Sequence, residues 1–167
     1  ALTPWVEMNP SLNAYAPSMI EREYFQILNQ ALPAHPVQIA IAGTIQPRKR
    51  QKEAVLAALH LISKGYNIVL NIYGYQLDSF GSYIREIEEI ITRSECGGKI
   101  KFWGFVEDPH QIAQDNHIIL CTSTDESASQ SILFNQAAGL LPVSCPAGGL
   151  PEIIIDGTTG FLTDGFE

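Results

Sequence analysis

The stretch Val37-Gln38-Ile39-Ala40-Ile41-Ala42-Gly43 begins the pattern that decides the fold. It is a short apolar run with β-branched residues, and a glycine ends it. A helix with apolar residues three and four positions apart is expected from about Arg50 until Gly65 stops it. A second apolar run, 67–73, then ends at Gly74. Strand, helix and strand in this order predict a βαβ unit with parallel strands.

The same alternation continues to about residue 155. Further strands are expected at 99–103, 117–121 and 142–145, and further helices at about 79–94, 109–115 and 129–138, with a last helical turn or strand at 151–155. The predicted strands are almost continuously apolar, which is typical of parallel strands that are buried on both faces. The predicted fold class is therefore α/β, a doubly wound, Rossmann-like parallel sheet flanked by helices over residues 37–167.

The first 36 residues differ from the rest because five prolines interrupt them. One helix with a single apolar face is expected at about 18–32. We interpret residues 1–36 as a connection into the domain with a packing helix. Because the chain starts at Ala1 and ends soon after Phe161-Leu162, we expect it to be a piece of a longer polypeptide.

Composition excludes several classes of protein. With 46% hydrophobic and 17% charged residues, the 167-residue chain is not disordered, and its net charge of −8 argues against general nucleic-acid binding. Its three cysteines lack metal-ligand spacing, and no apolar run approaches the roughly 20 residues of a membrane helix. We therefore expect no metal, no transmembrane segment and a cytoplasmic location. Four of the ten basic residues nevertheless cluster at one place: Arg48, Lys49, Arg50 and Lys52.

Ligands of open parallel sheets bind beyond the carboxyl ends of the strands. After the first strand come Gly43, which permits a sharp turn, and the basic run Arg48-Lys49-Arg50 at the start of the next helix. A helix N-terminus attracts anions, and arginine can bind phosphate oxygens with two donors at once. The run predicts a site for a small anionic ligand, and a solvated basic helix start is the alternative that the sequence leaves open.

The loops after the later strands add a carboxylate and more glycine. Glu126 is the only glutamate in the loop after the fourth strand, where it either serves a site or stabilises the start of the next helix. Gly148-Gly149 follows the fifth strand, and it indicates either close approach of the backbone to a ligand or a simple tight turn.

Other enzyme classes have little support. No Gly-x-Gly-x-x-Gly motif follows the first strand, and no Walker lysine loop is present. The four histidines are scattered, and none lies close in sequence to Ser123 or Ser129 as a base. Hydride transfer, P-loop phosphoryl transfer and hydrolysis are therefore disfavoured.

Six segments form a more specific set, at 42–51, 103–106, 123–126, 137–143, 148–154 and 156–162. The most specific are Gly148-Gly149-Leu150-Pro151-Glu152 and Asp156-Gly157-Thr158-Thr159-Gly160. Together they resemble the retaining nucleotide-sugar glycosyltransferases of GT-B architecture, of the glycosyl transferases group 1 or family 4 type. The resemblance is to the C-terminal, donor-binding half, and it implies that an N-terminal acceptor-binding domain and a helical C-terminal tail are missing.

The resemblance also implies residue roles. Arg48 and Lys49 would neutralise the donor diphosphate, and Glu126 matches the first glutamate of the family's Glu-x7-Glu motif, which reaches the transferred sugar. The remaining donor-binding positions would be Gly43, Thr44, Gly74, Phe105, Val106, Ser123, Ser129, Phe134, Gly148, Gly149 and Leu150. The implied partners are a nucleotide-sugar and, through the missing domain, a glycan, lipid or other acceptor. No metal or other cofactor is implied, so cationic groups and helix dipoles would hold the developing charge.

Three positions depart from the family pattern. Phe134 stands where the second glutamate is expected, Thr44 replaces an arginine of many members, and Ser129 replaces a common glycine. One hypothesis is therefore the donor-binding domain of a retaining glycosyltransferase, inactive without its other half. The alternative is a non-catalytic, glycosyltransferase-like binding or scaffold domain with a degenerate site. A sugar-nucleotide epimerase of the same architecture fits the Gly-Gly-Leu-Pro-Glu loop less well.

Overall fold

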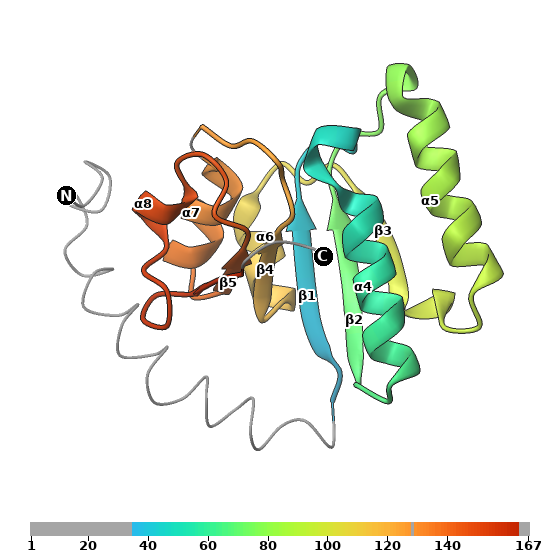
Figure 1. Cartoon of the computed structure of the whole chain (residues 1–167), viewed down its shortest axis with the longest axis horizontal. Helices are drawn as coiled ribbons and strands as arrows, with labels where there is room; N and C mark the ends of the chain where they lie inside the picture. Colours follow the sequence, from blue (N-terminus) through green and yellow to red (C-terminus); the bar gives the residue numbers. More distant parts are fainter. Residues whose placement is uncertain (1–34, 128, 164–167) are drawn as a thin grey trace.

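A computed structural model describes residues 35–127 and 129–163 of the chain. The connection and packing helix predicted for residues 1–36 lie almost wholly outside these described residues. The described part contains a six-stranded sheet whose neighbouring strands are all parallel (Figure 1). The order across the sheet is β3-β2-β1-β4-β5-β6, and the strands are Val37–Ala42 (β1), Ile68–Tyr73 (β2), Ile100–Gly104 (β3), Ile118–Cys121 (β4), Leu141–Ser144 (β5) and Phe161–Leu162 (β6).

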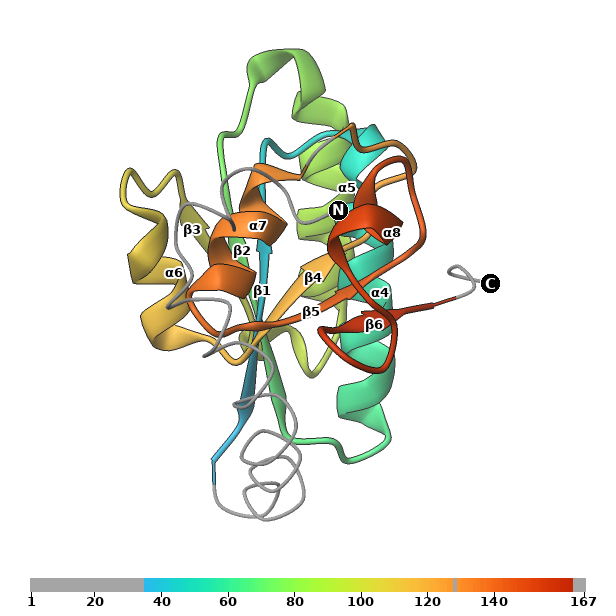
Figure 2. The same cartoon turned by 90° about the vertical axis from the view of Figure 1, so that its left-hand side faces the viewer.

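Helices cover both faces of this sheet. The pair α4 (Gln51–Ser63) and α5 (Gly81–Arg93) lies on one face, and the pair α6 (Pro109–Asp115) and α7 (Gln130–Ala137) lies on the other (Figure 2). The other helical segments are short: η2 (Pro47–Lys49), η3 (Asp78–Phe80), η4 (Gly97–Lys99) and α8 (Leu150–Ile153). The predicted doubly wound, Rossmann-like fold is confirmed, and the expected elements begin and end within two residues of the observed ones.

The short strand β6 is absent from the sequence prediction. It has two residues and pairs with β5, Val143 lying opposite Phe161. Two residues are too few to show an alternating or continuous apolar pattern. Only the neighbouring strand therefore defines it.

Two apolar cores hold the sheet between its helices. One contains Leu70 of β2, Val55 of α4 and Ile87 of α5, and each of these side chains is fully buried. The other contains Ile119 of β4 and Ile132 of α7. Each such side chain contributes about 1.5–3 kcal/mol to stability on burial. The strand ends that carry the loops are thus anchored on both faces.

One polar residue interrupts the buried run of β2, and its amide is fully used. Asn71 Nδ2 donates to Gln38 Oε1 (2.9 Å) and to Asn116 Oδ1 (2.8 Å), and Asn71 Oδ1 accepts from Trp103 Nε1 (2.9 Å). A buried polar group with all its partners is tolerated in a core. Burial also lowers the pKa of His117, whose Nδ1 accepts from the Gln38 N–H (2.9 Å), so this ring is a neutral structural acceptor.

The strand order creates a divergence next to β1. From β1 the chain proceeds to β2 and β3 on one side, and then crosses to β4, β5 and β6 on the other. The loops that follow β1 and β4 therefore lead to helices on opposite faces. Such a switch point is where open α/β sheets bind ligands.

Candidate functional site

The loop after β1 makes a compact basic turn before α4 begins. Pro47, Arg48 and Lys49 form the 3-10 turn η2, and Arg50 then adopts a left-handed conformation with φ 53°. Arg50 is the one non-glycine residue with positive φ in the part of the chain that the structure describes. The basic residues thus lie in the turn ahead of α4, whereas the sequence prediction placed them at the helix start.

Lys49 and Glu126 form an ion pair at the switch point. Lys49 Nζ bonds Glu126 Oε1, and the two side chains are 17% and 8% exposed. Ser123 Oγ also donates to Glu126 Oε1 (2.9 Å). The structure therefore brings together Lys49 from the loop after β1 with Ser123 and Glu126 from the loop after β4. An ion pair so largely removed from solvent is expected to fix both side chains firmly.

The alternative role of Glu126 as a helix-start carboxylate does not agree with its position. The helix α7 begins at Gln130 with Ser129 as its N-cap residue. Residues 127–129 separate Glu126 from the first residue of that helix, and its carboxylate bonds Lys49 and Ser123. Its charge is therefore used between the two loops.

Backbone contacts join the same two loops alongside the ion pair. The Thr124 N–H donates to the Arg48 carbonyl (3.1 Å), and Arg48 Nη1 donates to the Asp125 carbonyl. Arg48 remains exposed to solvent. Its side chain is therefore accessible to an anion in solution.

Gly148 and Gly149 are required by the protein's own loop after β4. Gly148 has φ +55°, and a Cβ atom there would lie 1.9 Å from the Glu126 carbonyl oxygen. The Gly149 N–H donates to that oxygen (2.8 Å), and a Cβ at Gly149 would lie 2.3 Å from the Ser127 carbonyl oxygen. The adjacent Leu150 is fully buried in the second core. This loop therefore supports the backbone that carries Glu126.

A second pair of glycines packs together at the ends of β1 and β2. A Cβ at Gly74, where φ is +144°, would lie 2.0 Å from the Gly43 carbonyl oxygen. The Gly43 N–H donates to the Tyr73 carbonyl (2.9 Å), so it is already used within the protein. A Cβ at Gly43 would meet the Lys49 Cε at 3.5 Å, which shows that the Lys49 side chain passes across this glycine.

Aromatic rings mark the loops after β2 and β3. Tyr75 and Phe105 stack with ring centroids 4.1 Å apart and an interplanar angle of 11°, and each is 51% exposed. Val106 packs partly buried against the second core. The sequence analysis selected Phe105 and Val106 but not Tyr75. The available signal was a large aromatic residue directly after the glycine that ends β2.

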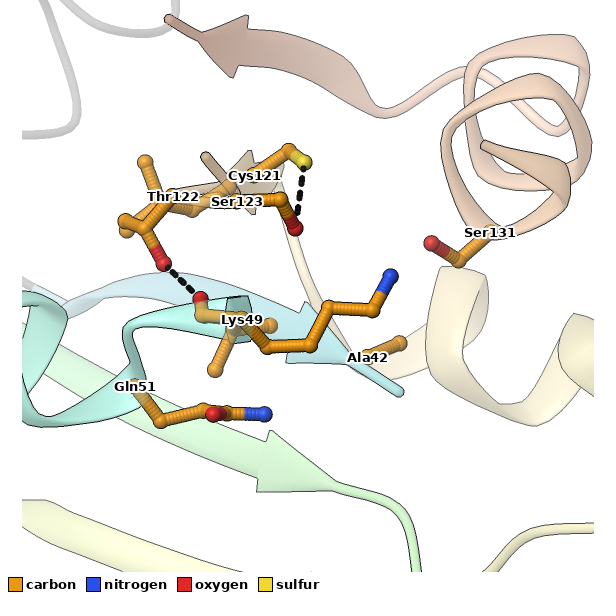
Figure 3. A pocket seen from close by; sticks show the side chains of 9 residues that line it. Ala42, Lys49, Gln51, Cys121, Thr122, Ser123 and Ser131 are labelled. Carbon is orange, nitrogen blue, oxygen red and sulfur yellow. Dashed lines mark hydrogen bonds between the residues drawn. The ribbon is translucent and has the colours of Figure 1, made fainter. Parts of the chain in front are cut away.

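A small pocket lies at the switch point itself (Figure 3). Its volume of about 10 Å³ is near the lower limit for one water molecule. Ala42 at the end of β1, Cys121 at the end of β4 and Ser131 of α7 come from three elements around it. The full lining is Ile41, Ala42, Lys49, Gln51, Leu120, Cys121, Thr122, Ser123 and Ser131.

Gln51 and Thr122 are two buried polar residues that the sequence analysis missed. Gln51 Nε2 donates to the Thr44 carbonyl (3.0 Å), and its Oε1 accepts from the Gln46 N–H (3.3 Å). Thr122 Oγ1 donates to the Lys49 carbonyl (2.6 Å). Each is 1% exposed. Both act on the main chain of the loop after β1, which no residue motif reveals.

The remaining predicted positions lie on α7. Ser129 is buried, with its Oγ 3.2 Å from Ser131 Oγ, and Phe134 is 44% exposed one turn further along the helix.

Cys145, just after β5, has a thiol whose pKa is raised by burial, which disfavours the reactive thiolate. Over residues 35–127 and 129–163, no His, Cys, Asp and Glu side chains are grouped to hold a metal ion. No helix in the described ranges is long and apolar enough to cross a membrane.

Comparison with known proteins identifies relatives over most of the chain. The family described as glycosyl transferases group 1 matches residues 26–166. A glycogen synthase of Pseudomonas paraeruginosa is 31% identical over 128 residues, which are 71% of this chain and 25% of that protein. The chain therefore spans a quarter of this curated relative.

Two solved structures show the same fold over most of this chain. HepE of Anabaena, in complex with UDP and glucose, is 26% identical with a TM-score of 0.73, covering 88% of this chain and 40% of that one. The C-terminal domain of the group 1 protein LpcC from Francisella tularensis is 24% identical with a TM-score of 0.70, covering 87% of this chain and 75% of that one. The resemblance to the C-terminal half of a GT-B glycosyltransferase is confirmed.

Proposed function

This chain belongs to the glycosyl transferases group 1 family, and we propose that it is the donor-binding half of an enzyme that transfers a sugar from a nucleotide-sugar with retention. The Lys49–Glu126 ion pair at the switch point is the observation that carries the proposal. It places a cation and a carboxylate side by side, at the position where this fold binds its ligands.

The charges at the switch point suit a nucleoside diphosphate. Lys49 is paired with Glu126, and Arg48 is exposed while its Nη1 donates to the Asp125 carbonyl, so both cations lie where the two phosphates would bind. When the bond between sugar and diphosphate breaks, negative charge grows on the diphosphate, and fixed cations stabilise it without reorganising. The proposal includes no metal and no cofactor, because these side chains supply the positive charge. The HepE structure that this chain matches holds UDP and glucose, which supports the ligand class.

Glu126 has a further role in this scheme. Its carboxylate takes part in the ion pair and also accepts from Ser123, so its position is fixed from two sides. In this scheme the Lys49 ammonium group keeps its contact with Glu126 while it engages the donor diphosphate. Glu126 would then face the sugar, where a carboxylate can accept hydrogen bonds from hydroxyl groups.

The missing wall of the site belongs to another domain in this proposal. The pocket at the switch point is far smaller than a nucleotide-sugar. The acceptor, whether a glycan, a lipid or another molecule, would enter from that second domain. We propose a cytoplasmic role in glycan or polysaccharide biosynthesis, and we expect the 167-residue chain to bind a donor but not to transfer sugar alone.

Phe134 favours a second candidate function. Its ring is 44% exposed on α7, and it stands where the family resemblance implies a glutamate that binds ribose. Losing such a charged hydrogen bond would weaken donor binding about ten- to hundredfold. On this basis the chain could be a non-catalytic glycosyltransferase-like domain with a degenerate donor site.

Titration calorimetry of the chain with UDP, GDP, ADP and their sugar conjugates tests both candidates. We expect one nucleotide series to bind, and the double variant Arg48→Ala/Lys49→Ala to bind at least about tenfold more weakly, because both phosphate cations are lost. Lys64→Ala is the matched control, since Lys64 lies at the far end of α4 and its loss should leave binding unchanged.

The Phe134→Glu variant separates the two candidates. A gain of tenfold or more in affinity would show a degenerate site still shaped for the donor. Absence of binding by any of these nucleotides at millimolar concentration, in both the original chain and Phe134→Glu, would contradict donor binding.

A further inference from the structure

Thr122 is the buried hydroxyl at the centre of the contact between the loops after β1 and β4. It follows the last residue of β4 and is 1% exposed. Its Oγ1 lies 2.6 Å from the Lys49 carbonyl oxygen (Figure 3). The Arg50 carbonyl oxygen is 3.2 Å away. A hydroxyl donates a single hydrogen, so the shorter contact with Lys49 is the principal bond.

The backbone that Thr122 contacts is unusual. Arg50 adopts a left-handed φ of 53°, a conformation that costs an L-residue with a Cβ atom free energy relative to helix or strand. The turn persists only because neighbouring contacts hold it. The Lys49 and Arg50 N–H groups donate to the Gln46 and Pro47 carbonyls (2.9 and 3.1 Å). Thr122 bonds the Lys49 carbonyl, which belongs to the same peptide group as the Arg50 N–H.

The direction of the Lys49 side chain depends on this turn. The side chain leaves the 3-10 turn, passes across Gly43 and reaches Glu126. Without the hydrogen bond from Thr122, the peptide group that follows Lys49 would be free to turn. The Lys49 side chain and its ammonium group would then move with the backbone. The contacts of Arg48 with Thr124 and Asp125 lie at the exposed side of the loop and are therefore easier to break.

We propose that Thr122 is a positioning residue for Lys49, and that it acts on donor binding through the Lys49 backbone. The expected effect on UDP binding rests on the proposed function, whereas the expected effect on the Lys49 backbone does not. Valine has the shape of threonine but cannot donate a hydrogen bond, so Thr122→Val removes the donor of the Lys49 carbonyl, whereas the Arg50 carbonyl keeps the Ala54 N–H. We expect Thr122→Val to weaken UDP binding about five- to tenfold.

The experiment measures two quantities on the chain with UDP as the probe. The first is the dissociation constant of UDP by calorimetry. The second is amide hydrogen exchange, without ligand, at Lys49, Arg50 and Ala54, the last of which donates to the Arg50 carbonyl (3.2 Å). We expect Thr122→Val to weaken UDP binding and to speed exchange at these amides. Thr122→Ser keeps the hydroxyl and should restore both quantities.

Two controls separate positioning from general loosening. Thr92→Val makes the same chemical change on α5, where the exposed Thr92 hydroxyl donates to the Glu88 carbonyl (2.8 Å), and it should change neither quantity. The double variant Thr122→Val/Lys49→Ala should bind UDP no more weakly than Lys49→Ala alone, because Thr122 acts through Lys49. Should Thr122→Val not fold, Thr122→Ser and Thr122→Ala provide a pair that differs only by the hydroxyl.

The possible outcomes are distinct. Unchanged exchange and unchanged UDP affinity in Thr122→Val would overturn the inference, as would fully additive losses in the double variant. If the original chain binds neither UDP nor any other nucleotide, the proposed function fails. Faster exchange at Lys49 and Arg50 in Thr122→Val, restored by serine, would in that case still support the role of Thr122 in setting the turn.

Discussion

At the carboxyl edge of the sheet, the loops after β1 and β4 meet through charges and hydrogen bonds, whereas the loops after β2 and β3 meet through stacked rings. We call the first region the charged half, comprising residues 43–50, 122–126 and Gly148-Gly149, and the second the aromatic half, comprising Gly74, Tyr75, Gly104 and Phe105. In the charged half Glu126 is buried, while Tyr75 and Phe105 are each 51% exposed. The two halves therefore obey different constraints.

Directional partners explain the difference. A buried charge or carbonyl is stable only if its partners are in place, so the charged half requires each loop to hold a fixed position. Stacked rings gain stability from surface contact over a range of geometries, and solvent on their outer faces tolerates small movements. We therefore expect the charged half to be more sensitive to substitution than the aromatic half.

Alanine substitution of one glycine in each half should give the largest contrast. Gly148→Ala would force a Cβ to within 1.9 Å of the Glu126 carbonyl oxygen at a φ of +55°, and we expect a loss of about 3 kcal/mol or more in the free energy of unfolding. Gly104→Ala, at φ +74° with no atom within 4 Å, should cost only about 1–2 kcal/mol of backbone strain. Urea unfolding of the two variants measures both values, and equal losses would contradict the greater sensitivity of the charged half.

Removing one member of the ion pair should have the next largest effect. Lys49→Met leaves the Glu126 carboxylate buried with only Ser123 among the contacts described above, and we expect a loss of about 2–3 kcal/mol in stability. Glu126→Gln should cost about 1 kcal/mol, since the amide can still accept hydrogen bonds. The double variant should be more stable than the sum of the single losses implies. Strictly additive losses in urea unfolding would show that the pair is not coupled.

Breaking the aromatic stack should have the smallest effect. A double-mutant cycle with Tyr75→Ala and Phe105→Ala should give a coupling of about 0.5–1 kcal/mol, because the rings are half exposed. The same urea titrations measure it. A coupling larger than that of Lys49 with Glu126 would reverse the order of the two halves.

The residues selected from sequence fall into two groups in the structure. Arg48, Lys49 and Glu126 were selected for their charge, Ser123 was implied by the family resemblance, and the structure places these residues together. Glycine chemistry was less specific, because Gly148-Gly149 fits equally a ligand contact or a simple tight turn, whereas the structure shows close packing against the Glu126 carbonyl. Thr122 and Gln51 could not be predicted, since a buried side chain that bonds a distant carbonyl has no sequence signature.

The sequence by itself determined the α/β alternation, the strand and helix positions and the family, because these follow from local apolar periodicity and from short motifs. Only the tertiary structure decided the strand order, which places β4 beside β1 and so joins Lys49 to Glu126 across 77 positions of the chain. The physical reason is that periodicity reports which faces are buried, which is a property of each segment alone. Which strand lies next to which depends on how all the helices pack over both faces at once.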